Sequence, residues 1–240
     1  MNRGRLAKYS LWQFRDFVVE TGVSIVIIGL LWGYLQLLPF RQSISPEMTP
    51  ELIVRLVTLL AGSLVSITVL IALNGIISTD RKMGYYRFMF AKPVSPVRYY
   101  AQLFFVHLVG LLSGMILLAG VFFFFAGRFN VWNLVLYTSL IYISLGGIGF
   151  FISAASRYDW VTLAAVWVGS RVLRALYGNG DDWKSKAVEL LPPVHKVDSV
   201  AGSIIATGAA PLSDVLWLTG YGALFFVLGL VVLQRRSLAA

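Results

Sequence analysis

The 240-residue chain contains no cysteine, two histidines and few charged residues, and each scarcity excludes a class of protein. Without cysteine the chain can form neither a disulfide nor a thiolate metal site. Only 13% of its residues are charged, well below the share in soluble domains, and 58% are hydrophobic. This composition excludes an ordinary soluble domain and indicates an integral membrane protein.

Enzymatic chemistry has few groups to use in this sequence. His107 and His195 are the two histidines, and no zinc-protease or serine-hydrolase motif occurs. The stretch from Gly178 to Ser185 faintly resembles a phosphate-binding loop, but Trp183 stands where that loop needs glycine before the lysine. We therefore expect no enzymatic activity, no bound cofactor and no metal in this chain.

Long apolar runs dominate the sequence. A hydrocarbon layer of about 30 Å needs roughly 20 apolar residues per helix. Six continuous runs come close to or reach this length: Val18 to Leu38, Leu52 to Ile77, Tyr100 to Ala126, Val131 to Ala155, Trp160 to Tyr177 and Val215 to Leu233. Continuous runs favour helices over transmembrane strands, which alternate in polarity. The sequence therefore predicts an all-α integral membrane protein, a single transmembrane domain over residues 1–240 with six transmembrane helices.

Basic residues are distributed unevenly between the two ends of these spans. With six spans both termini share one side, and twelve of the 20 lysines and arginines fall there: Arg3, Arg5, Lys8, Arg15, Arg81, Lys82, Arg87, Lys92, Arg98, Arg157, Arg235 and Arg236. Because such residues collect on the cytoplasmic side, we expect a multi-pass protein of the plasma (inner) membrane with both termini cytoplasmic and an uncleaved N-terminus. Most of the net charge of +9 then lies on the cytoplasmic face, where it meets anionic lipid or a protein partner, and we expect no nucleic-acid binding.

Two segments outside the apolar runs have helical patterns of their own. Residues 9–20 place six apolar side chains on one broad arc and Gln13, Asp16 and Glu20 opposite, which predicts an N-terminal amphipathic interfacial helix. The alternative is that this segment is simply the start of the first span. Residues 178–214 form an extracytoplasmic segment whose apolar part, Val200 to Leu212, is too short to cross a bilayer and predicts a re-entrant or interfacial helix.

A few residues within the spans stand out. Gly29-x-x-x-Gly33 and Gly110-x-x-x-Gly114 would let helices approach closely, although glycine is common in membrane spans. Four polar residues lie in spans: Asn74, His107, Arg171 and Arg174. The first two suit either an interhelical hydrogen bond or a pathway. The two arginines share a helix face and either extend outward to the headgroups or line the outer mouth of a pathway.

The loop from Asp80 to Arg98 is basic and aromatic. Aromatic anchors among basic residues suit a short cytoplasmic coupling helix that docks into a groove on a cytosolic partner. The alternative is a basic loop that only sets topology on anionic lipid. The aromatic cluster and the Pro93-x-x-Pro96 exit favour docking over this alternative.

Three places in the chain resemble the permease subunits of ABC-2 type ATP-binding cassette transporters: Asp80-Arg81 with Gly84, Pro93-Val94-Ser95 and Arg98; Leu191-Pro192-Pro193 through Gly202-Ser203 with Pro211-Leu212; and a last span that closes on Arg235-Arg236. Two places depart from the family. Tyr85-Tyr86-Arg87 stands where an acidic residue is usual, and Gln102 where a lysine is common. The importer signature is absent from the loop, which favours an exporter.

The resemblance implies a permease subunit of an ABC exporter with a hydrophobic or amphipathic substrate. It further implies a homodimer in the lipid bilayer and two copies of a separate ATPase subunit, which would hold ATP and Mg²⁺. The residues that would couple to the ATPase are Arg81, Gly84, Tyr85, Arg87, Phe88, Phe90, Pro93, Arg157 and Asp159, and the pathway candidates are the four polar residues named above. The alternatives are a non-transporting membrane anchor or sensor for a cytosolic partner and, less favoured because no carboxylate lies deep in a span, a secondary carrier.

The predicted topology can be tested with single cysteines, since the chain has none of its own. Cysteines at Ser95 and Ser237 should resist an impermeant thiol reagent applied outside intact cells, whereas cysteines at Ser45 and Ser185 should react. The measurement is labelling before and after permeabilisation. External labelling at Ser95 would overturn the topology.

Overall fold

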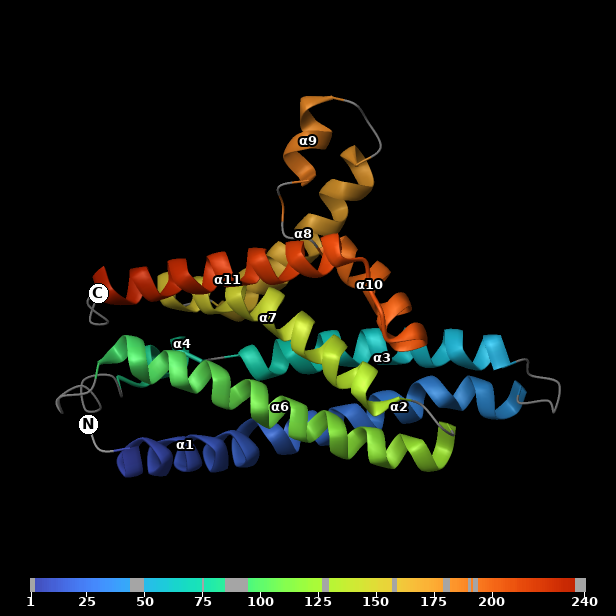
Figure 1. The fold of residues 1–240 in the computed structure, drawn as a ribbon, viewed down its shortest axis with the longest axis horizontal. Helices are drawn as coiled ribbons and strands as arrows, with labels where there is room; N and C mark the ends of the chain where they lie inside the picture. Colours follow the sequence, from blue (N-terminus) through green and yellow to red (C-terminus); the bar gives the residue numbers. More distant parts are fainter. Residues whose placement is uncertain are drawn as a thin grey trace. The chain divides into compact units, whose positions relative to one another are not determined.

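The computed structural model describes residues 3–43, 50–74, 76–84, 95–126, 130–156, 159–178, 182–189, 191 and 194–235. Every regular element in these ranges is a helix. In chain order they are α1 (Arg3–Phe17), the π-helix η1 (Val18–Gly22), α2 (Val23–Ser43), α3 (Pro50–Leu73), α4 (Ser78–Met83), α6 (Pro96–Ala126), α7 (Val131–Ala155), α8 (Asp159–Tyr177), α9 (Trp183–Glu189), α10 (Val194–Thr207) and α11 (Leu212–Arg235) (Figure 1). The predicted all-helical class is confirmed for this part of the chain.

Four stretches of described helix are long and apolar enough to cross a membrane. They are Tyr9–Leu35, Pro96–Val121, Val131–Ala155 and Leu212–Arg235. Helices α3 and α8 cover the second and fifth predicted spans, and in α3 the described apolar part is Gly62–Leu73. These helices agree with a membrane protein, while the number of six spans stays a prediction.

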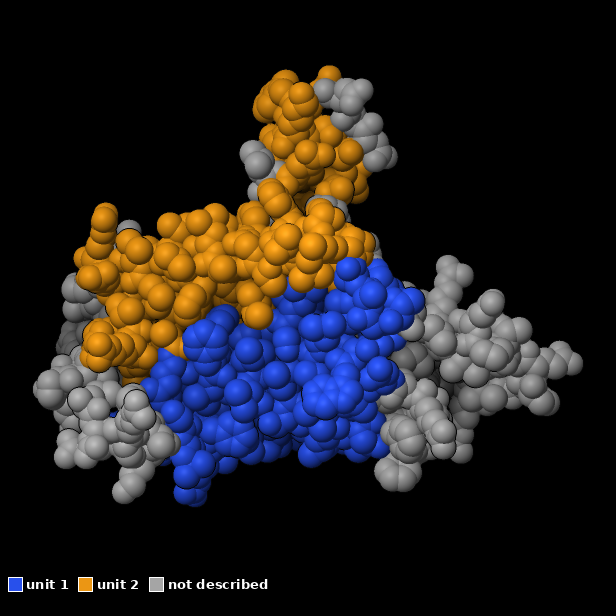
Figure 2. Space-filling view, viewed as in Figure 1, with its two compact units in different colours: residues 1–72, 102–142, 201–210 blue, residues 73–101, 143–200, 211–240 orange. Residues whose placement is uncertain are grey.

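The chain divides into two compact units, each assembled from segments that are distant in sequence (Figure 2). Unit 1 comprises residues 1–72, 102–142 and 201–210, and unit 2 comprises residues 73–101, 143–200 and 211–240. The division falls within α3, α6, α7 and α10, so each of these helices contributes residues to both units.

In unit 1 the N-terminal helices run parallel to α6. Helix α1 passes through η1 into α2 without a break, so the predicted interfacial segment 9–20 is continuous with the first span, and its position relative to a membrane stays a prediction. Glycines of both Gly-x-x-x-Gly motifs form the contacts: Phe17 packs on Gly110, Ile25 on Gly114 and Leu118 on Gly29. A Cβ atom at Gly110 would overlap the Phe17 ring. Both motifs therefore serve specific packing.

Contacts inside each unit also give the directions of α3, α6 and α7. Helix α3 runs parallel to α7, because Gly62 faces Tyr137 in unit 1 and Leu73 faces Gly149 in unit 2. Helix α6 runs antiparallel to α3. Thr68 of α3 lies 3.6 Å from the Met115 sulfur of α6, whereas Ala72, later in α3, contacts His107, which is earlier in α6. Parallel and antiparallel neighbours in this order are what spans of alternating direction require.

In unit 2 the backbones of α7 and α11 meet at glycine. A Cβ atom at Gly147 would overlap the carbonyl of Gly222, and one at Gly222 would overlap the carbonyl of Ile143. Next to this crossing, two aromatic pairs fill the space between the helices, with ring centroids 4.8 Å apart for Phe150–Phe226 and 5.5 Å for Phe151–Phe225. The two helices can approach this closely only where neither carries a side chain.

We therefore expect Gly222→Ala to destabilise the protein by about 1–3 kcal/mol, because the added methyl group must push two helix backbones apart. Gly220→Ala is the matched control on the same helix, since no atom lies within 4 Å of a Cβ atom built there. Thermal unfolding in detergent, followed by circular dichroism, compares the two variants. Equal stability of both would contradict the backbone contact.

Candidate functional site

The described coupling candidates lie at the end of unit 2 where α3 leads into α4. Ile76 and Ile77, between these helices, are buried. Helix α4 then spans Ser78–Met83 and includes Arg81, whose side chain lies outside the described residues. Gly84 has a φ of 70°, the left-handed conformation that glycine adopts at helix C-termini, and ends α4. The turn before α4 is thus part of the core of unit 2.

Two hydrogen bonds attach α4 and this turn to longer helices. The backbone N–H of Ile77 donates to the Ser153 hydroxyl of α7 at 3.2 Å. The hydroxyl of Tyr100, a fully buried residue of α6, donates to the Asp80 carboxylate of α4 at 3.0 Å. A hydrogen bond to a charged group in a buried setting is strong. Helix α4 is therefore fixed to both α6 and α7 within unit 2.

The remaining coupling candidates lie mostly outside the residues that the structure describes. Tyr85, Arg87, Phe88, Phe90, Pro93 and Arg157 lie outside the described residues. Asp159 is the first residue of α8, and its side chain is also outside the description. The structure thus describes the base of the loop, and the docking contacts stay a prediction.

His107 links helices within unit 1. It is half-buried on α6, and its Nδ1 lies 2.9 Å from the carbonyl oxygen of Ala72 near the end of α3. Its ring centroid lies 4.7 Å from that of Phe17. Asn74, by contrast, is exposed in the turn after α3 and belongs to unit 2. His107 therefore has the surroundings of an interhelical contact, and its role in a pathway stays a prediction.

Arg171 and Arg174 lie on the second half of α8 in unit 2. The Arg171 guanidinium lies 5.2 Å from the centre of the Trp167 ring, a cation–π distance. The Arg174 carbonyl accepts a 2.7 Å hydrogen bond from the N–H of Gly178, which ends the helix. The two residues between them in the sequence, Val172 and Leu173, are apolar and exposed. This setting suits both an outward-extending cation and a pathway lining.

Where the structure describes the predicted extracytoplasmic segment, it forms α9, α10 and the first residues of α11. In unit 2, Lys196 of α10 forms a 2.6 Å ion pair with Asp214 of α11. In unit 1, the second half of α10 packs by Ala201 near Gly62 of α3, and the Asn133 side chain of α7 donates to the Ile205 carbonyl at 3.4 Å. The stretch is therefore helical and packed, and whether it is re-entrant or interfacial stays a prediction.

One residue of α9 bears on the topology experiment. Ser185 is buried, whereas its neighbour Lys186 is exposed. A cysteine at Lys186 is therefore the better outer reporter, because a buried thiol can escape labelling on either side of a membrane.

A polar cluster that the sequence did not predict lies between α1 and α6. The Gln102 side-chain amide donates to the Ser10 hydroxyl at 2.8 Å and to the Gln13 side-chain carbonyl at 3.1 Å. Gln13 is only 2% exposed, whereas Leu11 on the apolar arc is 71% exposed. Two glutamines 89 residues apart give no spacing signal in a sequence. The cluster depends on which side of α1 faces α6, and periodicity alone does not fix that side.

No protein-family model matches the chain, and neither a curated protein nor a solved structure matches it significantly. The likeness to ABC-2 permeases therefore rests on the sequence motifs quoted above alone.

The attachment of α4 generates a prediction. Tyr100→Phe removes the hydroxyl that donates to Asp80, so we expect α4 to loosen by about 1.5–3 kcal/mol, the usual contribution of a hydrogen bond to a charged group. Hydrogen exchange of the amides of α4 measures the change. Tyr34→Phe is the control, since Tyr34 is an exposed tyrosine of α2. Unchanged exchange in α4 would mean that the bond does not hold this helix.

Proposed function

We propose that this protein is the membrane-spanning permease subunit of an ATP-binding cassette exporter for a hydrophobic or amphipathic substrate. Two copies would form the pathway in the plasma membrane, with both termini in the cytoplasm. Two copies of a separate ATPase subunit, which carry ATP and Mg²⁺, would dock beneath them. The permease itself supplies no catalytic group.

The attachment of α4 is the observation that carries this proposal. A force on α4 acts on α3 through the chain, on α7 through Ile77 and Ser153, and on α6 through Asp80 and Tyr100. An ATPase docked on the adjoining loop would therefore act on three long helices at once. A loop that only set topology on anionic lipid would need no such fixed base.

Among the pathway candidates, Arg171 and Arg174 support the proposal best. They lie on an exposed stretch of α8, where a cation could meet an anionic headgroup or substrate. His107 is engaged with the Ala72 carbonyl and Phe17, so it is a weaker candidate for substrate contact. Asn74 lies beside the base of the coupling loop and suits conformational coupling better than substrate binding.

The test purifies the wild-type protein from its native membrane in mild detergent and looks for a co-purifying ATPase. We expect the two to co-purify, and we expect replacement of Phe88 and Phe90 by serine to abolish co-purification while the permease stays inserted. The physical reason is that the aromatic anchors of a docked helix contribute most of its binding free energy. Trp132→Ser, a change at an exposed aromatic residue elsewhere, is the control.

Two outcomes would count against the proposal. If the double serine variant retained the ATPase as well as wild type, the coupling assignment would be wrong. If the wild-type protein retained a cytosolic partner without ATPase activity, the membrane anchor or sensor would replace the exporter.

A further inference from the structure

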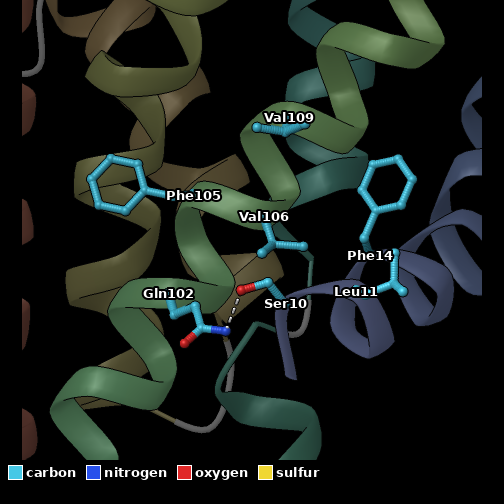
Figure 3. A pocket seen from close by; sticks show the side chains of 7 residues that line it. All are labelled: Ser10, Leu11, Phe14, Gln102, Phe105, Val106 and Val109. Atoms are coloured by element: carbon cyan, nitrogen blue, oxygen red, sulfur yellow. Dashed lines mark hydrogen bonds between the residues drawn. The ribbon is translucent and has the colours of Figure 1, made fainter. Parts of the chain in front are cut away.

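A groove between α1 and α6 lies on the surface of unit 1 (Figure 3). Its volume is about 670 Å³, within the range of ligand pockets. The lining residues are Ser10, Leu11 and Phe14 from α1 and Gln102, Phe105, Val106 and Val109 from α6. Figure 3 shows the polar pair Ser10 and Gln102 near one end and Val109 toward the other. The groove is thus apolar along its length and polar at one end.

The polar end retains hydrogen-bonding capacity. Gln102 joins Ser10 and Gln13 in one cluster, and within the described residues the side-chain nitrogen of the buried Gln13 has no acceptor. A buried donor without an acceptor costs free energy. Ser10 and Gln102 line the groove, so its polar end adjoins this cluster, while the Gln13 nitrogen itself is buried.

The charge of α1 favours an anion at the same end. Its sequence carries four basic residues and a single acid, Asp16. Arg15 is exposed and lies one helical turn after Leu11, which lines the groove, whereas Asp16 is rotated about 100° further around the helix. Long helical side chains lean toward the helix N-terminus, which directs Arg15 toward the end that holds Ser10.

We propose that this groove, the lipid groove, binds one acyl chain of an anionic phospholipid from the surrounding bilayer, with its headgroup at the Ser10–Gln102 end. Hydrocarbon suits the apolar length because it brings no backbone groups that need hydrogen-bond partners. The anionic charge of the headgroup suits the basic sequence of α1. The proposal is independent of any ATPase, because it concerns unit 1 and the lipid alone.

The experiment uses the full chain in mild detergent with equal amounts of phosphatidylglycerol and phosphatidylcholine, followed by native mass spectrometry. We expect wild type to retain one phosphatidylglycerol after delipidation. Val109→Trp should fill the groove and weaken this binding about tenfold, the loss expected when roughly two methylene groups are displaced. Leu117→Trp is the matched control, because Leu117 is exposed on the same helix outside the groove.

A second variant tests the headgroup without disturbing packing. Arg15→Gln changes an exposed side chain, and it should reduce the preference for phosphatidylglycerol over phosphatidylcholine about fivefold. Arg235→Gln removes the same charge from an exposed position in unit 2 and should leave the preference unchanged. Retention of no lipid by wild type, equal retention by Val109→Trp and Leu117→Trp, or equal binding of both lipids would each overturn the proposal. The proposal would also be overturned if wild type formed a dimer that Val109→Trp dissociates, because a second copy of the chain would then occupy the groove.

Discussion

Inside a membrane, apolar helices gain little by leaving lipid for one another, because acyl chains are as apolar as leucine. Close packing must then supply the attraction, and it requires places where two helices can approach without side chains between them. Both units have such places. In unit 1 the Phe17 ring occupies the space that Gly110 leaves open, and in unit 2 the backbones of α7 and α11 meet at Gly147 and Gly222. These contacts set which face of each helix is buried.

Once the helices are this close, polar side chains can bond to backbone groups of their neighbours. The Tyr142 hydroxyl donates to the Phe104 carbonyl at 2.8 Å, and the imidazole of His107 lies at hydrogen-bond distance from the Ala72 carbonyl. Ser153 accepts from the Ile77 N–H in the turn before α4. Such bonds fix the axial position of one helix against the next. The attachment of α4 is thus a consequence of the packing.

The sequence predicted where the helices lie better than which face of each helix is buried. Val131 to Ala155 matches α7 at both ends, whereas α6 begins earlier than predicted, at Pro96, because proline suits the first turn of a helix. The amphipathic arc of residues 9–20 predicted an interfacial helix, whose position relative to a membrane stays a prediction, but the arc placed Gln13 on the polar side and the structure buries it. That outcome depends on the fit of Phe17 to Gly110, a contact between residues far apart in the chain. The polar cluster at Gln102 follows from it and could not be predicted from either helix alone.

Helix α6 connects the attachment of α4 with the lipid groove. Helix α6 carries Tyr100, which holds α4, and two residues later Gln102, which holds the polar end of the groove. A helix transmits displacement along its axis because its backbone hydrogen bonds keep it stiff. Tyr100 and Gln102 therefore lie on one continuous helix, two residues apart. A lipid bound in this groove would therefore act on the same helix that the coupling loop acts on.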